Sequence, residues 1–183
     1  MSRKRLSLFV LLAAAALIGA GVAAAGHRPP SVQAASATFD ATTVTQHSLT
    51  TCSVNGGDTF QATRAAYTGT ASSSDPRLAG ALTIRAWSLV DTTNGVGHLY
   101  GIWHIRGAGT HANGTLNAAL AGGKASGLAR GYVHGPWGHL VASLGAGFDP
   151  TTGFSSGSIG SSTVGAGFLR SGRWCHPPHW PQD

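Results

Sequence analysis

The side chains most able to do chemistry lie at alternating positions in two stretches of the chain, residues 96–106 and 124–134. They carry phenol, imidazole and guanidinium groups, which can bind a ligand through hydrogen bonds and charge: Tyr100, His104, Arg106, Tyr132 and His134. Successive side chains of an extended strand point to opposite sides, so each stretch places these groups on one face. We take them as a candidate ligand-binding set. The alternative is an ordinary solvated outer face.

Catalytic chemistry has little support in the sequence. The chain contains no glutamate, and four of its six aspartates adjoin turn residues, where a carboxylate bonds nearby backbone N–H groups. No aspartate is placed to orient a histidine. We therefore predict no catalytic residue and favour a non-enzymatic protein. An enzyme remains an alternative: a cyclase- or isomerase-like barrel acting on a lipophilic substrate, with Tyr and His side chains turned inward.

A metal site is also weakly supported. His98 and His104 lie six residues apart, which is about 20 Å along a strand, so one strand cannot bring both to one metal. Residues 174–180 contain one cysteine and two histidines, a set that can bind zinc or copper. Cys175 is better used in a disulfide, however. We predict no metal and no cofactor, and keep a metal- or cell-wall-binding tail as a further alternative.

The first 34 residues have the parts of a secretory signal peptide. Residues 2–5 are basic, residues 8–25 are apolar, and small residues follow at cleavage spacing. An uncleaved anchor is the alternative. We expect a secreted, extracellular bacterial protein with no membrane segment after removal of the leader. Four of the 12 basic residues and no acid precede residue 35, so the net charge falls from +6 to +2. The other basic residues are scattered along the sequence, so we expect no nucleic-acid partner.

The chain contains two cysteines, Cys52 and Cys175. Because export favours oxidation, we expect them to form a disulfide that ties the C-terminal tail to the start of the domain. The chain-entropy model gives such a long loop at most about 4–5 kcal/mol of stabilisation. Two free thiols or metal ligands are the alternative.

Alternating runs joined by short turns continue from residue 59 to residue 163, and no helical period interrupts them. This pattern predicts an all-β fold: a closed or nearly closed antiparallel up-and-down barrel of about eight strands. Two turns, residues 91–95 and 149–153, both run from Asp to Gly and predict the same hairpin chemistry. We expect a signal peptide at 1–34, a lead-in and first strand or strands at 35–58, the barrel at 59–170 and a tail at 171–183. The expected inward-facing side chains are apolar and recur at alternating positions: Leu82, Ile84, Leu99, Trp103, Ile105, Leu116, Leu120, Leu140, Leu144 and Phe148.

Three segments carry a resemblance to known proteins: SSSDPRLAGALTI (72–84), DTTNGVGHLYGIWHIR (91–106) and GFDPTTGF (147–154). They resemble a recurring pattern in secreted bacterial all-β proteins that are themselves uncharacterised. In strand count and turn style the chain is also similar to the small closed barrels of the allene oxide cyclase and dirigent type. The acidic residues of those barrels have no counterpart here, so the resemblance implies a barrel and assigns no functional residue.

These observations together predict a secreted, non-enzymatic, disulfide-closed barrel that binds a small apolar ligand or a cell-surface partner. An eight-stranded barrel is about wide enough either to be filled by side chains or to hold one small ligand. A filled lumen would make the protein a scaffold that acts through its outside. The ligand and the oligomeric state are left open.

Overall fold

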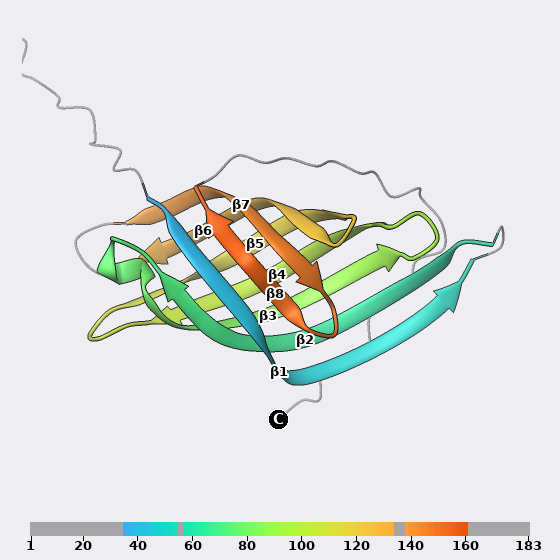
Figure 1. Cartoon of the computed structure of the whole chain (residues 1–183), viewed down its shortest axis with the longest axis horizontal. Helices are drawn as coiled ribbons and strands as arrows, with labels where there is room; N and C mark the ends of the chain where they lie inside the picture. Colours follow the sequence, from blue (N-terminus) through green and yellow to red (C-terminus); the bar gives the residue numbers. More distant parts are fainter. Residues whose placement is uncertain (1–34, 55–56, 134–137, 161–183) are drawn as a thin grey trace, which may run out of the picture. The chain divides into compact units, whose positions relative to one another are not determined.

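The computed structural model describes residues 35–54, 57–133 and 138–160, which form a closed barrel of eight antiparallel strands (Figure 1). This confirms the predicted fold class. The strands follow one another around the barrel in chain order, and one short 3-10 helix lies between the second and third. The elements are β1 (Ala37–Ser53), β2 (Thr59–Ser72), η1 (Pro76–Leu78), β3 (Gly80–Asp91), β4 (Val96–Arg106), β5 (His111–Ala121), β6 (Lys124–Val133), β7 (His139–Asp149) and β8 (Gly153–Ile159). The predicted leader and tail lie outside the described residues.

Strand β1 closes the barrel and then extends beyond the closure. Its first residues pair with β8, from Ala37 opposite Ile159 to Ala41 opposite Phe154. Strand β2 pairs with β1 from Thr38 to Ser53, so beyond Ala41 β1 pairs with β2 alone (Figure 1). We expected residues 35–58 to lead into a barrel beginning at residue 59. In the structure residues 37–53 are one continuous strand that belongs to the barrel.

Alternation along the strands separates an apolar interior from a polar exterior. The burial of β4 changes at nearly every residue, because neighbouring side chains of a strand point to opposite sides of the sheet. All ten side chains expected to face inward are buried, which confirms that part of the prediction: Leu82, Ile84, Leu99, Trp103, Ile105, Leu116, Leu120, Leu140, Leu144 and Phe148.

The indole of Trp103 lies flat across glycines of the two following strands. Gly114 of β5 is opposite Trp103, and Gly131 of β6 is opposite Gly114. A Cβ atom added at Gly131 would lie 2.3 Å from the indole ring, and one added at Gly114 would lie 2.7 Å from it. The indole Nε1 donates a hydrogen bond to the carbonyl of Thr115, at 3.2 Å. The two glycines therefore make room for the largest side chain of the interior.

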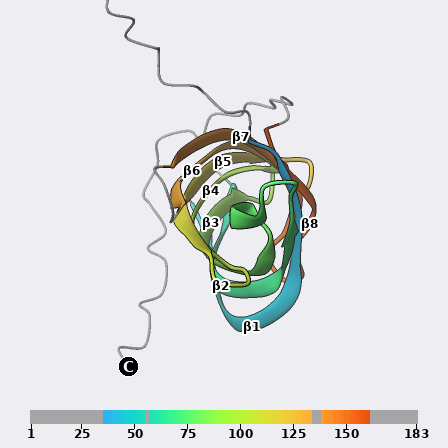
Figure 2. The same ribbon diagram turned by 90° about the vertical axis from the view of Figure 1, so that its left-hand side faces the viewer.

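Helix η1 lies across the opening at one end of the barrel (Figure 2). The side chain of Asp75 starts the helix, since its Oδ1 accepts a hydrogen bond from the Arg77 backbone N–H at 3.0 Å. The Arg77 guanidinium also forms an ion pair with this carboxylate at 2.7 Å. The arrangement turns Leu78 into the lumen, where it is almost fully buried. Leu78 thus adds to the side chains that fill this end of the interior.

Three aromatic rings fill another part of the lumen. Tyr67 and Phe154 meet edge to face at 5.4 Å between ring centroids, and Phe154 and Phe148 lie 4.8 Å apart. The Tyr67 hydroxyl donates a hydrogen bond to the carbonyl of Pro150 at 2.8 Å. Burial raises the pKa of this hydroxyl well above its usual value, and the nearby Asp149 carboxylate adds to the effect. Tyr67 is therefore a neutral hydrogen-bond donor that joins β2 to the β7–β8 turn.

The β3–β4 turn has the predicted aspartate cap. Asp91 Oδ1 accepts hydrogen bonds from the backbone N–H groups of Thr93 and Asn94, at 2.9 and 3.1 Å. The Asn94 side chain donates to Asp91 Oδ2 at 2.6 Å. Gly95 then takes a left-handed conformation, with φ of +67°, which only glycine adopts without cost.

The β7–β8 turn repeats this chemistry, so the prediction for the pair of turns is confirmed. Asp149 Oδ1 accepts hydrogen bonds from the backbone N–H groups of Thr151 and Thr152, at 2.7 and 3.1 Å. Gly153 enters β8 with φ of +92°. Each turn thus has its own carboxylate, which accepts hydrogen bonds from the first backbone N–H groups, and its own glycine, which lets the chain reverse.

These hydrogen bonds lower the pKa of both turn carboxylates. The Asn94 side chain is the largest cause at Asp91, and the Thr151 side chain is the largest cause at Asp149. A carboxylate whose pKa is lower in the folded state binds its proton less readily there than in the unfolded chain. The stability it contributes is complete above its unfolded pKa and is lost as the pH falls through the folded pKa.

Acid should therefore destabilise the wild-type barrel, and the double variant Asp91→Asn/Asp149→Asn should be less sensitive to it. Asparagine keeps a side-chain oxygen that can cap the turn but carries no titrating charge. Urea unfolding at several values between about pH 7 and about pH 2.5 measures the effect. If the free energy of unfolding fell equally steeply with pH in the wild type and the double variant, the two turn carboxylates would not be the cause of the acid sensitivity.

Candidate functional site: the polar face of β4 to β7

The described members of the predicted binding set point out of the barrel. Tyr100 and Tyr132 are 36 % and 37 % exposed, and His104 and Arg106 are also exposed. His134 lies outside the described residues. Sequence alternation placed these side chains on one side of each strand, and the structure shows that this side is the outside. These four side chains are thus exposed, as the solvated-face alternative expects. Any ligand that they bind must lie on the outer surface.

Strand register brings three of these residues together. His104 of β4 is opposite Asn113 of β5, and Asn113 is opposite Tyr132 of β6. Two pairs further along the same hairpin, and on the same face, Arg106 is opposite His111. Adjacent strands are about 4.8 Å apart, so His104, Arg106 and Tyr132 share one region of the surface.

Tyr100 lies apart from this region. Tyr100 precedes His104 by four positions along β4, a distance of about 13 Å. Its ring packs against Trp87 of β3 at 5.4 Å between centroids. The structure thus divides the predicted set, and the region near the β4–β5 hairpin is the more polar part.

We call this region the polar face, and it contains four side chains that the candidate set did not include. Tyr132 is opposite His139 of β7, and the two rings meet edge to face at 5.3 Å. The polar face is defined by seven outward side chains: His104, Arg106, His111, Asn113, Arg130, Tyr132 and His139. The signal for His111 was present in the sequence, since a short hairpin must place it beside Arg106. His139 had no such signal, because its neighbour across the sheet is set by the β6–β7 register.

The charged side chains of this face are all positive. Among the described residues the aspartates lie on β1 or at turns, and none points outward from the middle of β4 to β7. Arg106 and Arg130 form no ion pair within the described part of the chain, where the one salt bridge joins Arg77 to Asp75. This face therefore carries two arginines, and none of the described aspartates lies on it to balance them.

A shallow open groove of about 540 Å³ runs along the end of the β4–β5 hairpin, on the polar face. Side chains and backbone of the hairpin line it, including His104, Arg106, Thr110, His111 and Asn113. Its polar groups are hydrogen-bond donors, acceptors and one guanidinium, and the apolar Ile105 and Ala112 also line it. It suits a polar, negatively charged ligand that lies on the surface.

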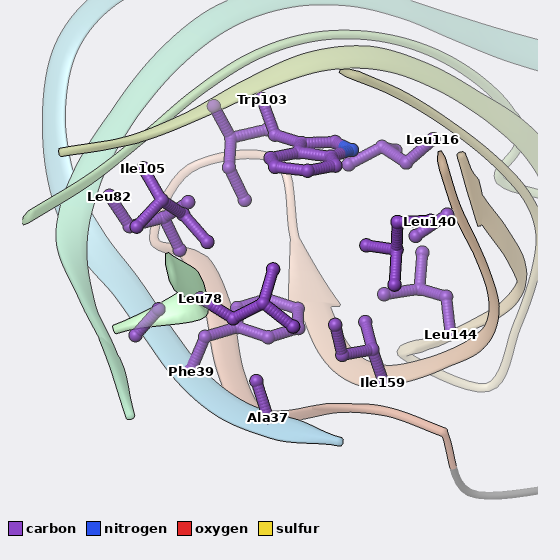
Figure 3. Close-up of a pocket in the computed structure, with 13 residues that line it drawn as sticks. Ala37, Phe39, Leu78, Leu82, Trp103, Ile105, Leu116, Leu140, Leu144 and Ile159 are labelled. Carbon is purple, nitrogen blue, oxygen red and sulfur yellow. The ribbon is translucent and has the colours of Figure 1, made fainter. Parts of the chain in front are cut away.

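The lumen offers a different environment (Figure 3). The cavity found there measures about 40 Å³, whereas pockets for small organic ligands measure about 300–1,000 Å³. Apolar side chains from all around the barrel converge on it, among them Leu78, Trp103, Leu116 and Leu144 (Figure 3). None of the described tyrosines and histidines lines this cavity. The inward-turned Tyr and His groups that the enzyme alternative requires are therefore not supplied by Tyr100, His104 or Tyr132.

A metal centre has no support in the described residues, which contain no group of three His, Cys or Asp side chains close enough to share an ion. The cysteine and histidines of the tail, the other metal candidate, lie outside these residues. Within the same residues, no helix is long and apolar enough to span a membrane.

Comparison of the chain with protein-family models, with curated proteins and with solved structures found no match. The class that the structure defines is thus a closed eight-stranded antiparallel barrel with a side-chain-filled lumen. The resemblance to secreted bacterial proteins and to the cyclase and dirigent barrels stays a prediction.

Proposed function

We propose that the protein is a secreted, non-enzymatic β-barrel that binds a cell-surface partner through its outside. The observation that carries this proposal is the contrast between the two surfaces. The lumen retains about 40 Å³ among apolar side chains, while the polar face presents arginine, histidine and tyrosine without a carboxylate. A small apolar ligand would need a lumen several times larger.

Secretion and the disulfide belong to the same proposal. The leader at residues 1–34 supports export, and export supports a bridge between Cys52 and Cys175. Cys52 lies near the end of β1, where that strand has passed its pairing with β8. A bridge there would fix the part of β1 that pairs with β2 alone.

A sedimentation assay tests the proposed function directly. Labelled mature protein is mixed with a cell-envelope fraction of the producing bacterium, and the bound fraction is measured. The wild type should sediment with the envelope, and Arg106→Ala/Arg130→Ala should stay in solution. The lumen variant Leu116→Ala, if it remains folded by circular dichroism, should bind as the wild type does. Equal sedimentation of the wild type and the double arginine variant would contradict binding through the polar face.

Native mass spectrometry of the exported protein completes this test. We expect a mature chain without the leader, a mass lower by two hydrogens because of the disulfide, and no lipid adduct. A co-purified lipid in stoichiometric amount would overturn the choice of the outside over the lumen.

A further inference from the structure

We propose that the partner of the polar face is an acidic polysaccharide, a sugar chain whose charges are carboxylates. This inference rests on the proposed function and names the chemistry of the partner. Three properties of the polar face carry it: two guanidinium groups that form no ion pair with the described residues, hydrogen-bonding side chains between them, and an aromatic pair beside them.

The arginines are placed as separate anion sites. By strand register, Arg130 lies two strands from Arg106 and four residues further along the sheet, or about 10 Å across and about 13 Å along the strands. Each guanidinium can bind a carboxylate through two parallel hydrogen bonds, a geometry that a lysine cannot supply. Neither has a carboxylate partner among the described residues. Two anion sites at this separation fit a chain whose charges are spaced, rather than one compact anion.

The side chains between the arginines suit hydroxyl groups. His104, His111 and Asn113 lie in the groove along the β4–β5 hairpin. Imidazole and carboxamide groups both donate and accept hydrogen bonds, as sugar hydroxyls require.

The aromatic pair extends this surface onto the next strands. Tyr132 and His139 meet edge to face at 5.3 Å, and both are exposed. Their carbon faces offer apolar area next to polar edges, the combination by which tyrosine is enriched at binding surfaces. A sugar ring has the same character, with C–H groups on its faces and hydroxyls at its rim. The pair therefore favours a glycan over a simple polyanion.

A nucleic acid fits less well. Duplex DNA carries one negative charge per about 1.7 Å of its axis, and proteins that bind it usually neutralise many phosphates with clustered Lys and Arg. The polar face has two arginines, and the chain after its leader has a net charge of only +2. We therefore commit to the polysaccharide and make nucleic acid an outcome of the test.

The test measures binding of the mature, full-length protein to immobilised polygalacturonate, with dextran as the neutral sugar chain. Arg106→Ala and Arg130→Ala should each weaken binding to polygalacturonate about tenfold, the effect of one charged hydrogen-bonded contact. Tyr132→Ala should weaken it as well. Arg106→Lys should recover part of the loss, because lysine keeps the charge but not the two-bond geometry. Dextran should bind none of the proteins.

Lys124→Ala is the matched control. Lys124 is an exposed cation at the β5–β6 turn. Strand β5 begins opposite Arg106 and ends opposite Val96, at the other end of β4. The turn therefore lies at the other end of the strands from the β4–β5 hairpin. Its removal changes the net charge by the same amount as removal of an arginine and should leave binding unchanged. An equal loss for Lys124→Ala would show attraction by net charge alone and overturn the inference.

Two further arms separate this inference from the proposed function. Tighter binding to a single-stranded oligodeoxythymidylate or to inorganic polyphosphate than to polygalacturonate would overturn the polysaccharide. If polygalacturonate does not bind, while sedimentation with the cell envelope still depends on Arg106 and Arg130, the inference fails and the proposed function stands. If that sedimentation is also independent of the arginines, both fail.

Discussion

Trp103→Ala should lower the free energy of unfolding by about 3–5 kcal/mol, the range measured when large buried aromatic side chains are truncated. Trp103 is 5 % exposed and lies across two neighbouring strands. Its removal takes away apolar contacts, opens space beside glycines that have no side chains to fill it, and leaves the Thr115 carbonyl without its indole donor. Urea unfolding followed by far-ultraviolet circular dichroism measures the loss.

Trp87→Ala is the natural comparison. Trp87 lies on the outer side of β3, partly exposed, with its ring against Tyr100. The same truncation there should cost clearly less, because no enclosed cavity results. A similar loss for both tryptophans would show that the lumen is not packed as tightly as the structure indicates.

Gly131→Ala should be the second large effect, with a loss of about 3 kcal/mol at the upper end of the range for overpacking. The added Cβ would lie 2.3 Å from the Trp103 ring and 2.5 Å from the backbone carbonyl of Asn113. A backbone atom in a closed sheet cannot move away without breaking the ladder. Gly145→Ala on β7 is the control: the nearest atom to its added Cβ is Ser158 Oγ at 3.8 Å, an ordinary contact.

The double variant Trp103→Ala/Gly131→Ala separates the two causes of this loss. If the indole contributes, the two losses should add to more than the loss of the double variant, because the methyl group then enters the space the ring left. Strict additivity would mean that the backbone clash with Asn113 acts alone. Denaturation midpoints of the four proteins in one cycle decide between these outcomes.

Much of the barrel could be predicted because alternation is a local signal. From residue 81 to residue 148, one face of each strand is buried and the other is exposed, so the apolar residues mark the inside directly. The signal fails in β1. Residues 45–50 are all exposed. Neither side of the strand is buried there, so apolar and polar residues need not alternate. The sequence therefore reads as a lead-in and a short strand where the structure has one strand.

The candidate site was less predictable, because it depends on which residues become neighbours across strands. His104 and Tyr132 lie 28 residues apart and meet only through Asn113 on the strand between them. That register is fixed by where each hairpin turns, which alternation alone does not determine. The direction of the polar face could be inferred from the apolar positions opposite it. His111, beside Arg106 in a short hairpin, could be inferred as well, whereas His139, whose neighbour is set by the β6–β7 register, could not.

The order of the strands has a consequence for how the chain reaches this fold. Seven of the eight strand pairings join consecutive strands, which can zip from short turns with little loss of chain entropy. Only the pairing of β1 with β8 joins segments more than a hundred residues apart. Closure is therefore the kinetically demanding event, and until it occurs the curved sheet exposes two unpaired edges through which nascent chains could aggregate.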